Sequence, residues 1–165
     1  MDGAVGRFMH PTNVASSPSG ELWVNDFFYP NQAMQLRKIT QAQDAPATVT
    51  TLPRNDSGVT VVGAIDATGN RYENWYLAIH KTTPAGVRTL LAGNPRAPGS
   101  ADGAGIDAGF GAISGMAVDA DGTLYVADRG NATVRKVSPA GVVTTLAGSA
   151  GLTGSQDGTG AAARF

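Results

Sequence analysis

Cysteine is absent from this chain of 165 residues, and charged side chains are scarce, at 15% of the total. Without cysteine the fold cannot depend on disulfides, and no thiolate is available as a nucleophile or a metal ligand. No apolar run of about 18 residues occurs, so the sequence predicts no membrane-spanning helix. Residues 1–11 contain neither a basic nor a long apolar segment, so they predict no signal peptide, although an excised domain of a secreted protein would look the same. We expect a soluble chain and leave its compartment open.

The signatures of common enzymes are also missing. The sequence contains no Gly-x-Ser-x-Gly, no His-Glu-x-x-His and no paired-cysteine motif. Its formal net charge of −1 gives the chain as a whole no electrostatic reason to bind nucleic acid or an anionic membrane. Only two histidines occur, and no block of sequence gathers several metal ligands. We therefore expect no catalytic residue, no metal site and no cofactor.

Glycine and proline are plentiful, and they separate short runs of β-branched and apolar residues. The pattern is clearest in residues 101–148, where turn sequences recur roughly every eight to ten residues. No helical spacing of apolar residues fits this stretch, which favours an antiparallel meander. The Asp121-Gly122 step favours a type I′ hairpin turn. We predict strands at 115–119, 123–127, 133–138 and 142–147.

The same stretch resembles a known family. It contains an Asp-Gly-x-Gly segment that begins at Asp102, a phenylalanine at Phe110, and then GMAVDADGTLYVADRGNATVRKVSPAGVVTTLAG from Gly115. This sequence resembles an NHL repeat, the blade of a family of β-propellers, over residues 101–148 and less closely elsewhere. The resemblance implies a four-stranded blade, usually one of about six around a central channel. It also implies that the Asp-Gly segment is a connector whose phenylalanine packs between blades.

Three blocks of this kind align along the chain. The aligned lysines are Lys38, Lys81 and Lys136, which are 43 and 55 residues apart, and these spacings suit four-stranded blades with variable loops. We predict an all-β chain of about three four-stranded antiparallel NHL-like blades, half of a six-bladed β-propeller. The blades are approximately residues 2–54, 55–100 and 101–155, and residues 156–165 start a further repeat. The second block is the most degenerate, so we expect an irregular blade there.

The alignment also predicts which side chains are buried. The expected core residues are Trp23, Leu52, Phe110, Val118, Leu124, Val126, Val134 and Leu146. Asp26 and Asp128 follow the second strand of their blocks at matching places, where we expect them to accept hydrogen bonds from turn amides. His80 stands where the other blocks have Arg37 and Arg135.

The candidate binding residues lie in the first block. Successive hairpins reverse the chain, so in every blade the second-to-third-strand connection and the entry to the first strand share one face of the ring, here called the loop face. The first block has four additional residues in that connection, and they are aromatic. Exposed aromatic side chains are good anchors for a ligand or a protein, whereas the alternative is that the rings fold back over the second blade. The predicted binding residues are His10, Asp26, Phe27, Phe28 and Tyr29.

These observations favour a non-catalytic binding or scaffolding module that presents its loop face to a protein or a small ligand. The alternative is a propeller hydrolase or lyase whose channel site is completed by a second subunit or by missing sequence. Related propeller lyases and lactonases hold a channel metal with several histidine and carboxylate ligands. The two unmatched histidines of this chain, His10 and His80, give little support for such a site. RNA binding, known for some NHL propellers with basic faces, is a third class that the net charge disfavours.

An open stack of three blades exposes a sheet face at each end. We therefore expect either self-association into a six-bladed propeller dimer or completion by the missing part of a longer propeller. The segments that begin at Asp2 and Asp157 resemble each other, so the two ends of the chain would compete for one position in a dimer.

Overall fold

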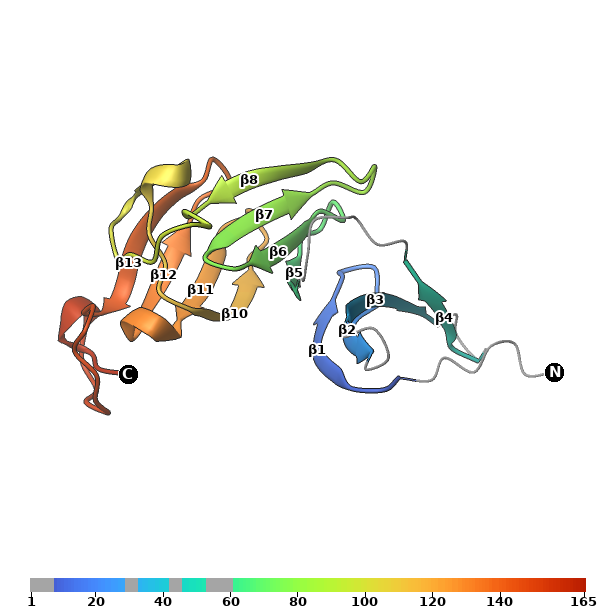
Figure 1. Ribbon diagram of the computed structural model, residues 1–165, viewed down its shortest axis with the longest axis horizontal. Coiled ribbons are helices and arrows are strands. Elements are labelled where there is room, and N and C mark those ends of the chain that lie inside the picture. The colour runs from blue at the N-terminus through green and yellow to red at the C-terminus, as the bar shows by residue number, and fades with distance from the viewer. Residues whose placement is uncertain (1–7, 29–32, 42–45, 53–60) are drawn as a thin grey trace.

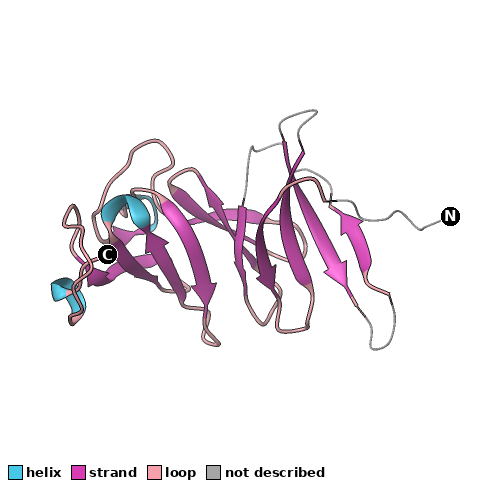
Figure 2. Cartoon of the chain, turned by 90° about the horizontal axis from the view of Figure 1, so that it is seen from below, coloured by secondary structure: helices cyan, strands magenta, loops and turns pink. Residues whose placement is uncertain are grey.

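The computed structural model describes residues 8–28, 33–41, 46–52 and 61–165, and three antiparallel sheets account for most of them. The sheets follow one another along the chain and lie side by side (Figures 1 and 2). We call them blade one, blade two and blade three. The predicted all-β fold of three blades is thereby confirmed. None of the described segments forms a helix with the length and apolar character needed to cross a membrane.

Each blade is a meander in which strands adjacent in sequence are paired. Blade one consists of β1 (Pro11–Ser16), β2 (Leu22–Phe28), β3 (Ala33–Thr40) and β4 (Thr48–Thr51). Blade two consists of β5 (Val61–Ile65), β6 (Arg71–Trp75), β7 (Ala78–Thr82) and β8 (Arg88–Ala92). Blade three consists of β10 (Ile113–Val118), β11 (Leu124–Asp128), β12 (Thr133–Val137) and β13 (Val142–Gly148), and the short β9 (Gly103–Ala104) pairs with β13. Three short 3₁₀ turns complete the described structure: η2 (Gly105–Asp107), η3 (Arg129–Asn131) and η4 (Gly160–Ala162).

One turn chemistry closes five of the hairpins. In each turn the first side chain accepts a hydrogen bond from the N–H four residues later, and a glycine three residues later has a φ of 80–85°. The first residues of the turns are Ser17, Asp66, Thr83, Asp119 and Ser138. Neither Ala120 nor Asp121 has a positive φ, so the predicted type I′ turn is wrong. Only the glycine takes the left-handed conformation, which it adopts without steric cost.

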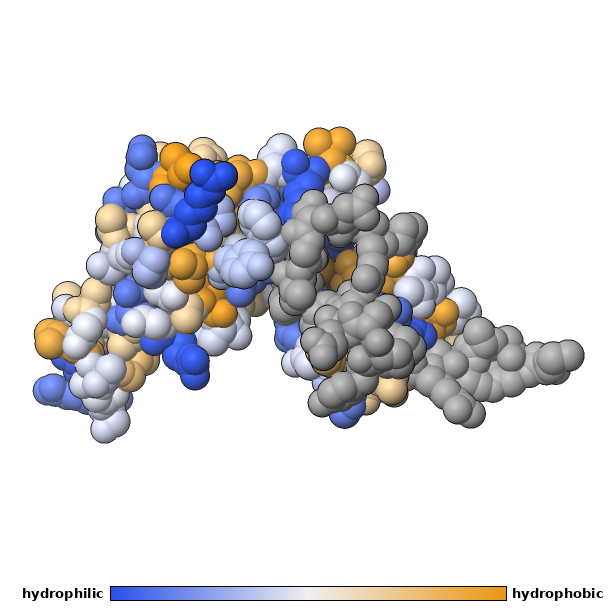
Figure 3. Space-filling model, in the orientation of Figure 1, coloured by the Kyte–Doolittle hydropathy of each residue, from blue (hydrophilic) through white to orange (hydrophobic). Residues whose placement is uncertain are grey.

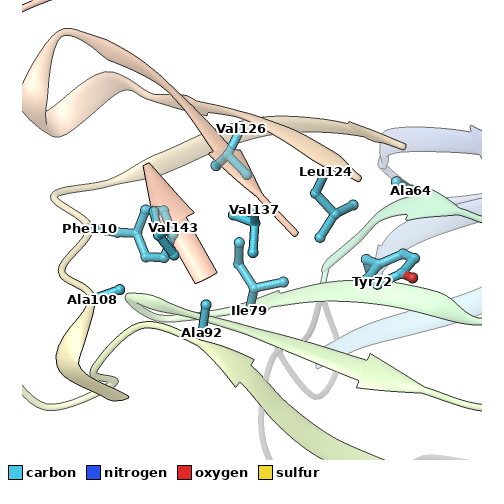
Figure 4. Packing of buried hydrophobic residues seen from close by; sticks show 10 residues of the cluster. All are labelled: Ala64, Tyr72, Ile79, Ala92, Ala108, Phe110, Leu124, Val126, Val137 and Val143. Carbon is cyan, nitrogen blue, oxygen red and sulfur yellow. The ribbon is translucent and has the colours of Figure 1, made fainter. Parts of the chain in front are cut away.

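The core between blades two and three confirms the expected role of Phe110. Its side chain has no exposed surface and belongs to a cluster of buried residues from both blades (Figure 4). The cluster contains Ala64, Tyr72, Ile79, Ala92, Ala108, Phe110, Leu124, Val126, Val137 and Val143. A smaller cluster of Ala15, Trp23, Val62 and Ile65 joins blades one and two. Connector and sheets are therefore packed as one unit.

The predicted core was correct for Trp23, Phe110, Leu124 and Val126, which are all buried. Leu52, Val118 and Val134 are only partly buried. Leu146 was predicted wrongly, because 46% of it is exposed. The pairing of β12 with β13 shifts after Val134, so Val134 lies opposite Ala147, Arg135 lies opposite Thr145, and Leu146 has no opposite residue. Such a bulge interrupts the alternation of inward-facing and outward-facing side chains along the strand, on which the prediction relied.

Blade two is more regular than the sequence suggested. It has all four strands, and the register shifts between β5 and β6 and between β7 and β8 occur where blade three has its own. The connection between β6 and β7 is a two-residue turn of Tyr76 and Leu77. A tight turn of this length suits an antiparallel pair, so the expectation of an irregular blade is wrong.

A pair of truncations tests the corrected register. Leu124→Ala removes a fully buried side chain and should lower the free energy of unfolding by about 2–5 kcal/mol in a denaturant titration. Leu146→Ala should change it by less than about 0.5 kcal/mol, because the side chain is exposed. Equal losses for the two variants would contradict the bulge.

The turn at Asp66 predicts a dependence of stability on pH. Burial raises the pKa of Asp66, but hydrogen bonds from Asn70, Thr68 and Tyr72 outweigh it and lower the pKa from 3.8 to about 2. The stabilisation is therefore present above the unfolded pKa and is lost as the pH falls through the folded pKa. We expect the melting temperature to decrease between pH 4 and about pH 2, and Asp66→Asn should reduce this dependence in thermal melts. An unchanged slope in the variant would show that other carboxylates account for it.

Candidate functional site

Two equivalent aspartates, Asp26 within β2 and Asp128 at the end of β11, support the backbone of the loop face. The Oδ1 atom of Asp128 accepts hydrogen bonds from the N–H groups of Gly111 (2.9 Å) and Ala112 (3.1 Å). Oδ1 of Asp26 accepts the same pair of bonds from Met9 (3.0 Å) and His10 (2.9 Å). Both aspartates are completely buried. Both bond backbone amides, as predicted, but these amides belong to the segment that leads into the first strand of their blade. Asp26 lies beneath the surface rather than on it.

Arg135 lies in the middle of this arrangement and is also completely buried. Its guanidinium donates to Oδ2 of Asp128 (3.3 Å), to Oδ1 of Asp102 (2.8 Å), and to the carbonyl oxygens of Gly109 and Ala101 (both 2.9 Å). The ring of Phe110 lies 5.4 Å from the guanidinium carbon. We call Asp102, the two carbonyl groups and the Phe110 ring the arginine cradle.

The cradle joins the connector to blade three. Asp102 also accepts two hydrogen bonds from Thr145 on β13, at 3.1 and 2.9 Å. Burial raises the pKa of Asp102, but the bonds from Thr145 and Arg135 outweigh it and hold the pKa below its ordinary value. The carboxylate is therefore ionised near pH 7 and complements the guanidinium. The repeated Arg-Lys pair was a signal in the sequence, but nothing in the sequence showed that the arginine is buried.

Blade one repeats part of this arrangement. The Nη1 atom of Arg37 lies 3.6 Å from Oδ2 of Asp26, and its guanidinium carbon lies 5.1 Å from the ring centre of Phe8. Phe8 thus takes the place that Phe110 has beside Arg135.

Blade two replaces the ion pair with aromatic rings. Trp75 and His80 occupy the positions of Asp128 and Arg135, and their ring centres lie 5.4 Å apart in an edge-to-face arrangement. Burial and the positive charge of Arg88 lower the pKa of His80 to about 4, so its ring is neutral near pH 7. The buried carboxylate of this blade is Glu73, which accepts a hydrogen bond from the hydroxyl group of Thr82 (3.0 Å).

The turn between β6 and β7 places an aromatic side chain on the loop face. Tyr76 is 72% exposed, has a φ of 54°, and packs edge-on against Trp75 at 5.3 Å. The repeat alignment did not single out this pair, although Trp75 at the end of β6 and Tyr76 in the turn are adjacent aromatic residues. On the side shown in Figure 3, the described apolar side chains form small separate groups, so no broad apolar patch marks a binding surface there.

The structure brings together three of the predicted binding residues. The carbonyl oxygen of His10 accepts a hydrogen bond from the N–H of Phe27 (3.0 Å), and Asp26 holds the N–H of His10. The aromatic insertion lengthens the hairpin of β2 and β3, because Phe28 still pairs with Ala33. The side chain of Phe28 and all of Tyr29 lie outside the described residues. His10 is exposed and Phe27 is partly buried.

A groove of about 440 Å³ lies on the open side of blade one, and its lining is mostly apolar. It is lined by Phe8, Pro11, Thr12, Asn13, Val14, Val24 and Ile39. Val24 and Ile39 occupy the positions of Val126 and Val137, which are buried between blades two and three. The groove is therefore a surface of the kind that packs between blades. Within the described ranges, no three His, Asp or Glu side chains are grouped as metal ligands.

Comparison with known proteins gives a family match for one stretch and a fold for the rest. Residues 110–137 match the model of the NHL repeat, which confirms the resemblance for this blade. No curated protein matches the chain in sequence. The chain is similar to a Bacteroides thetaiotaomicron protein of unknown function from structural genomics, with 24% identity and a TM-score of 0.67 over 92% of this chain and 39% of that one.

Two further structures share the fold. One is an auxiliary nutrient binding protein from Bacteroides ovatus, with 20% identity and a TM-score of 0.61 over 84% of this chain and 36% of that one. The other is a catalytically inactive virginiamycin B lyase from Staphylococcus aureus with quinupristin, with 17% identity and a TM-score of 0.50 over 82% of this chain and 40% of that one. This chain thus spans about two fifths of the length of these structures.

Replacement of Arg135 tests the cradle. Arg135→Ala leaves Asp128 buried without its cation, so the free energy of unfolding should fall by about 3–5 kcal/mol. Lys136→Ala, at the exposed neighbouring position, serves as the matched control and should change it by less than about 0.5 kcal/mol. Denaturant titrations of both variants give the comparison, and a small effect for Arg135 would mean that the cradle is dispensable.

Proposed function

We propose that this chain is a non-catalytic binding module whose loop face contacts a protein or a small ligand. The observation that carries the proposal is Tyr76, a largely exposed aromatic side chain on a residue with positive φ. For a residue other than glycine that conformation is energetically unfavourable. A tyrosine held in this way against Trp75 is preorganised, and aromatic side chains with both apolar and polar parts are preferred anchors in interfaces.

In blade one, His10 and Phe27 are the described residues that would extend this surface. Phe27 lies near the equivalent connection of the neighbouring blade, and His10, directly before β1, accepts a hydrogen bond from the N–H of Phe27. Phe28 and Tyr29 follow Phe27 in sequence. Asp26 contributes by holding the backbone of His10. The similarity to structures described as auxiliary nutrient binding proteins supports a role in binding.

A propeller lyase or hydrolase remains the second candidate. It is favoured by His10, which is exposed directly before β1. The first strands β1, β5 and β10 contact one another from blade to blade, so residues at their entries come from neighbouring blades. Elemental analysis of protein purified without chelators separates the candidates. We expect no stoichiometric metal, whereas one equivalent of zinc that is lost in His10→Ala would favour the enzyme.

Binding measurements on paired variants test the module directly. Monosaccharides, oligosaccharides, amino acids and short peptides are screened by thermal shift, and the affinities of the stabilising compounds are then measured by calorimetry. Tyr76→Ala should weaken binding by a factor of about 30, as expected for an interface anchor worth about 2 kcal/mol. Val87→Ala removes an exposed side chain from the opposite face and should leave affinity unchanged. Equal affinities of the two variants would place the site elsewhere.

A further inference from the structure

The segment after blade three has the conformation of the connector that precedes blade three. Equivalent residues lie 55 positions apart, and their backbone hydrogen bonds correspond. Gly99 donates to Phe110 and Gly154 donates to Phe165, both at 3.1 Å, while Gly109 donates to Ala101 and Arg164 donates to Gln156, both at 3.0 Å. Each segment also begins at a glycine with positive φ, Gly93 (94°) and Gly148 (86°), against which the phenylalanine ring packs.

The C-terminal segment therefore carries the groups of a second arginine cradle. Its parts are the carboxylate of Asp157, the carbonyl groups of Gln156 and Arg164, and the ring of Phe165, which correspond to the groups that hold Arg135. Phe110 is fully buried, whereas 52% of Phe165 is exposed. Among the described residues, no hydrogen-bond or ion-pair partner is found for Asp157, and its side chain is exposed.

The sheet beside this second cradle is also less covered than its counterpart. Val134 and Ala147 of blade three correspond to Ile79 and Ala92 of blade two. Ile79 and Ala92 are completely buried against blade three, whereas Val134 and Ala147 are only partly buried. The cradle and these side chains form one surface with the chemistry of a contact between blades.

We propose that this surface binds blade one of a second copy of the chain, with Arg37 of that copy in the cradle. Arg37 has the position on the third strand of blade one that Arg135 has in blade three. Its partner Asp26 is equivalent to Asp128, the partner of Arg135. The groove lined by Val24 and Ile39 lies on the same side of blade one and offers the apolar surface that Val126 and Val137 give in blade three. This inference is independent of the proposed function.

A two-fold axis makes the contact reciprocal. Each copy donates Arg37 to its partner and receives the partner's Arg37 in its own cradle, so two identical interfaces close the assembly. Two chains of three blades give six, which is within the range of about four to eight blades found in closed propellers. Both open sheet faces are then covered.

Phe8 is a competitor for this contact. Its ring already lies 5.1 Å from Arg37 of its own chain, in the place that Phe165 of the second copy would take. Phe165 must displace it, so Phe8 competes with assembly. Removal of the Phe8 ring should therefore strengthen the dimer, an effect that general hydrophobic association would not produce.

Sedimentation equilibrium over a concentration series tests the proposal. We expect a mass near twice 16.8 kDa at high concentration. Phe165→Ala and Asp157→Asn should each raise the dissociation constant at least tenfold, and Phe8→Ala should lower it. Leu152→Ala is the matched control, because it removes another exposed apolar side chain of the same segment and should have no effect. Circular dichroism checks that each variant keeps its β-structure, which the exposure of Phe165 and Asp157 makes the expected result.

Two results would overturn the inference. One is a 16.8 kDa monomer at every concentration for both the unaltered chain and Phe8→Ala. The other is a dimer whose dissociation constant responds to Leu152→Ala as strongly as to Phe165→Ala and Asp157→Asn, which would indicate a different interface. A dimer weakened by the two cradle variants and strengthened by Phe8→Ala supports it.

Discussion

The buried guanidinium of Arg135 is the interaction on which the arrangement of blade three depends. One side chain bonds a carboxylate at the end of β11, a carboxylate of the connector and two carbonyl groups of the same connector. A cation without exposed surface is tolerated when carboxylates and hydrogen-bond acceptors surround it, as Asp128, Asp102 and the two carbonyl groups surround Arg135. The connector therefore has one position relative to the sheet, and with it Phe110 has one position between the blades.

The sequence was sufficient for the strands because turn residues and β-branched runs are local signals. It was insufficient for Leu146, since a bulge in the pairing of β12 and β13 depends on both strands and reverses the alternation at one residue. It was also insufficient for Arg135, because an Arg-Lys pair in a strand is usually a solvated one. Only the connector, 26 to 34 residues earlier in the chain, makes burial of this charge possible.

In the candidate site, too, local features could be predicted and contacts between distant residues could not. That Asp26 and Asp128 bond backbone amides could be predicted because aspartate commonly does so, but the sequence did not show that these amides lie 16 or 17 residues earlier in the chain. The exposed turn of blade two was read as degeneracy. Trp75 and His80 differ from the other blades as a pair: the positions that form an ion pair in the other blades form a pair of rings here. When His80 alone is compared with Arg37 and Arg135, blade two lacks the pattern of the repeat. When Trp75 is compared as well, a contact between two rings takes the place of an ion pair. Blade two thus has a stable core and a loop-face turn with its own chemistry.

The two tryptophans of the chain, Trp23 and Trp75, belong to blades one and two, and blade three has none. Arg71 lies over the first ring at 4.9 Å and Arg88 over the second at 5.5 Å. Tryptophan fluorescence therefore reports on blades one and two and has no probe within blade three. Repeat architectures lose cooperativity when the contacts between units are unequal, so optical signals from the indoles and from the peptide backbone would separate wherever blade three unfolds apart from its neighbours.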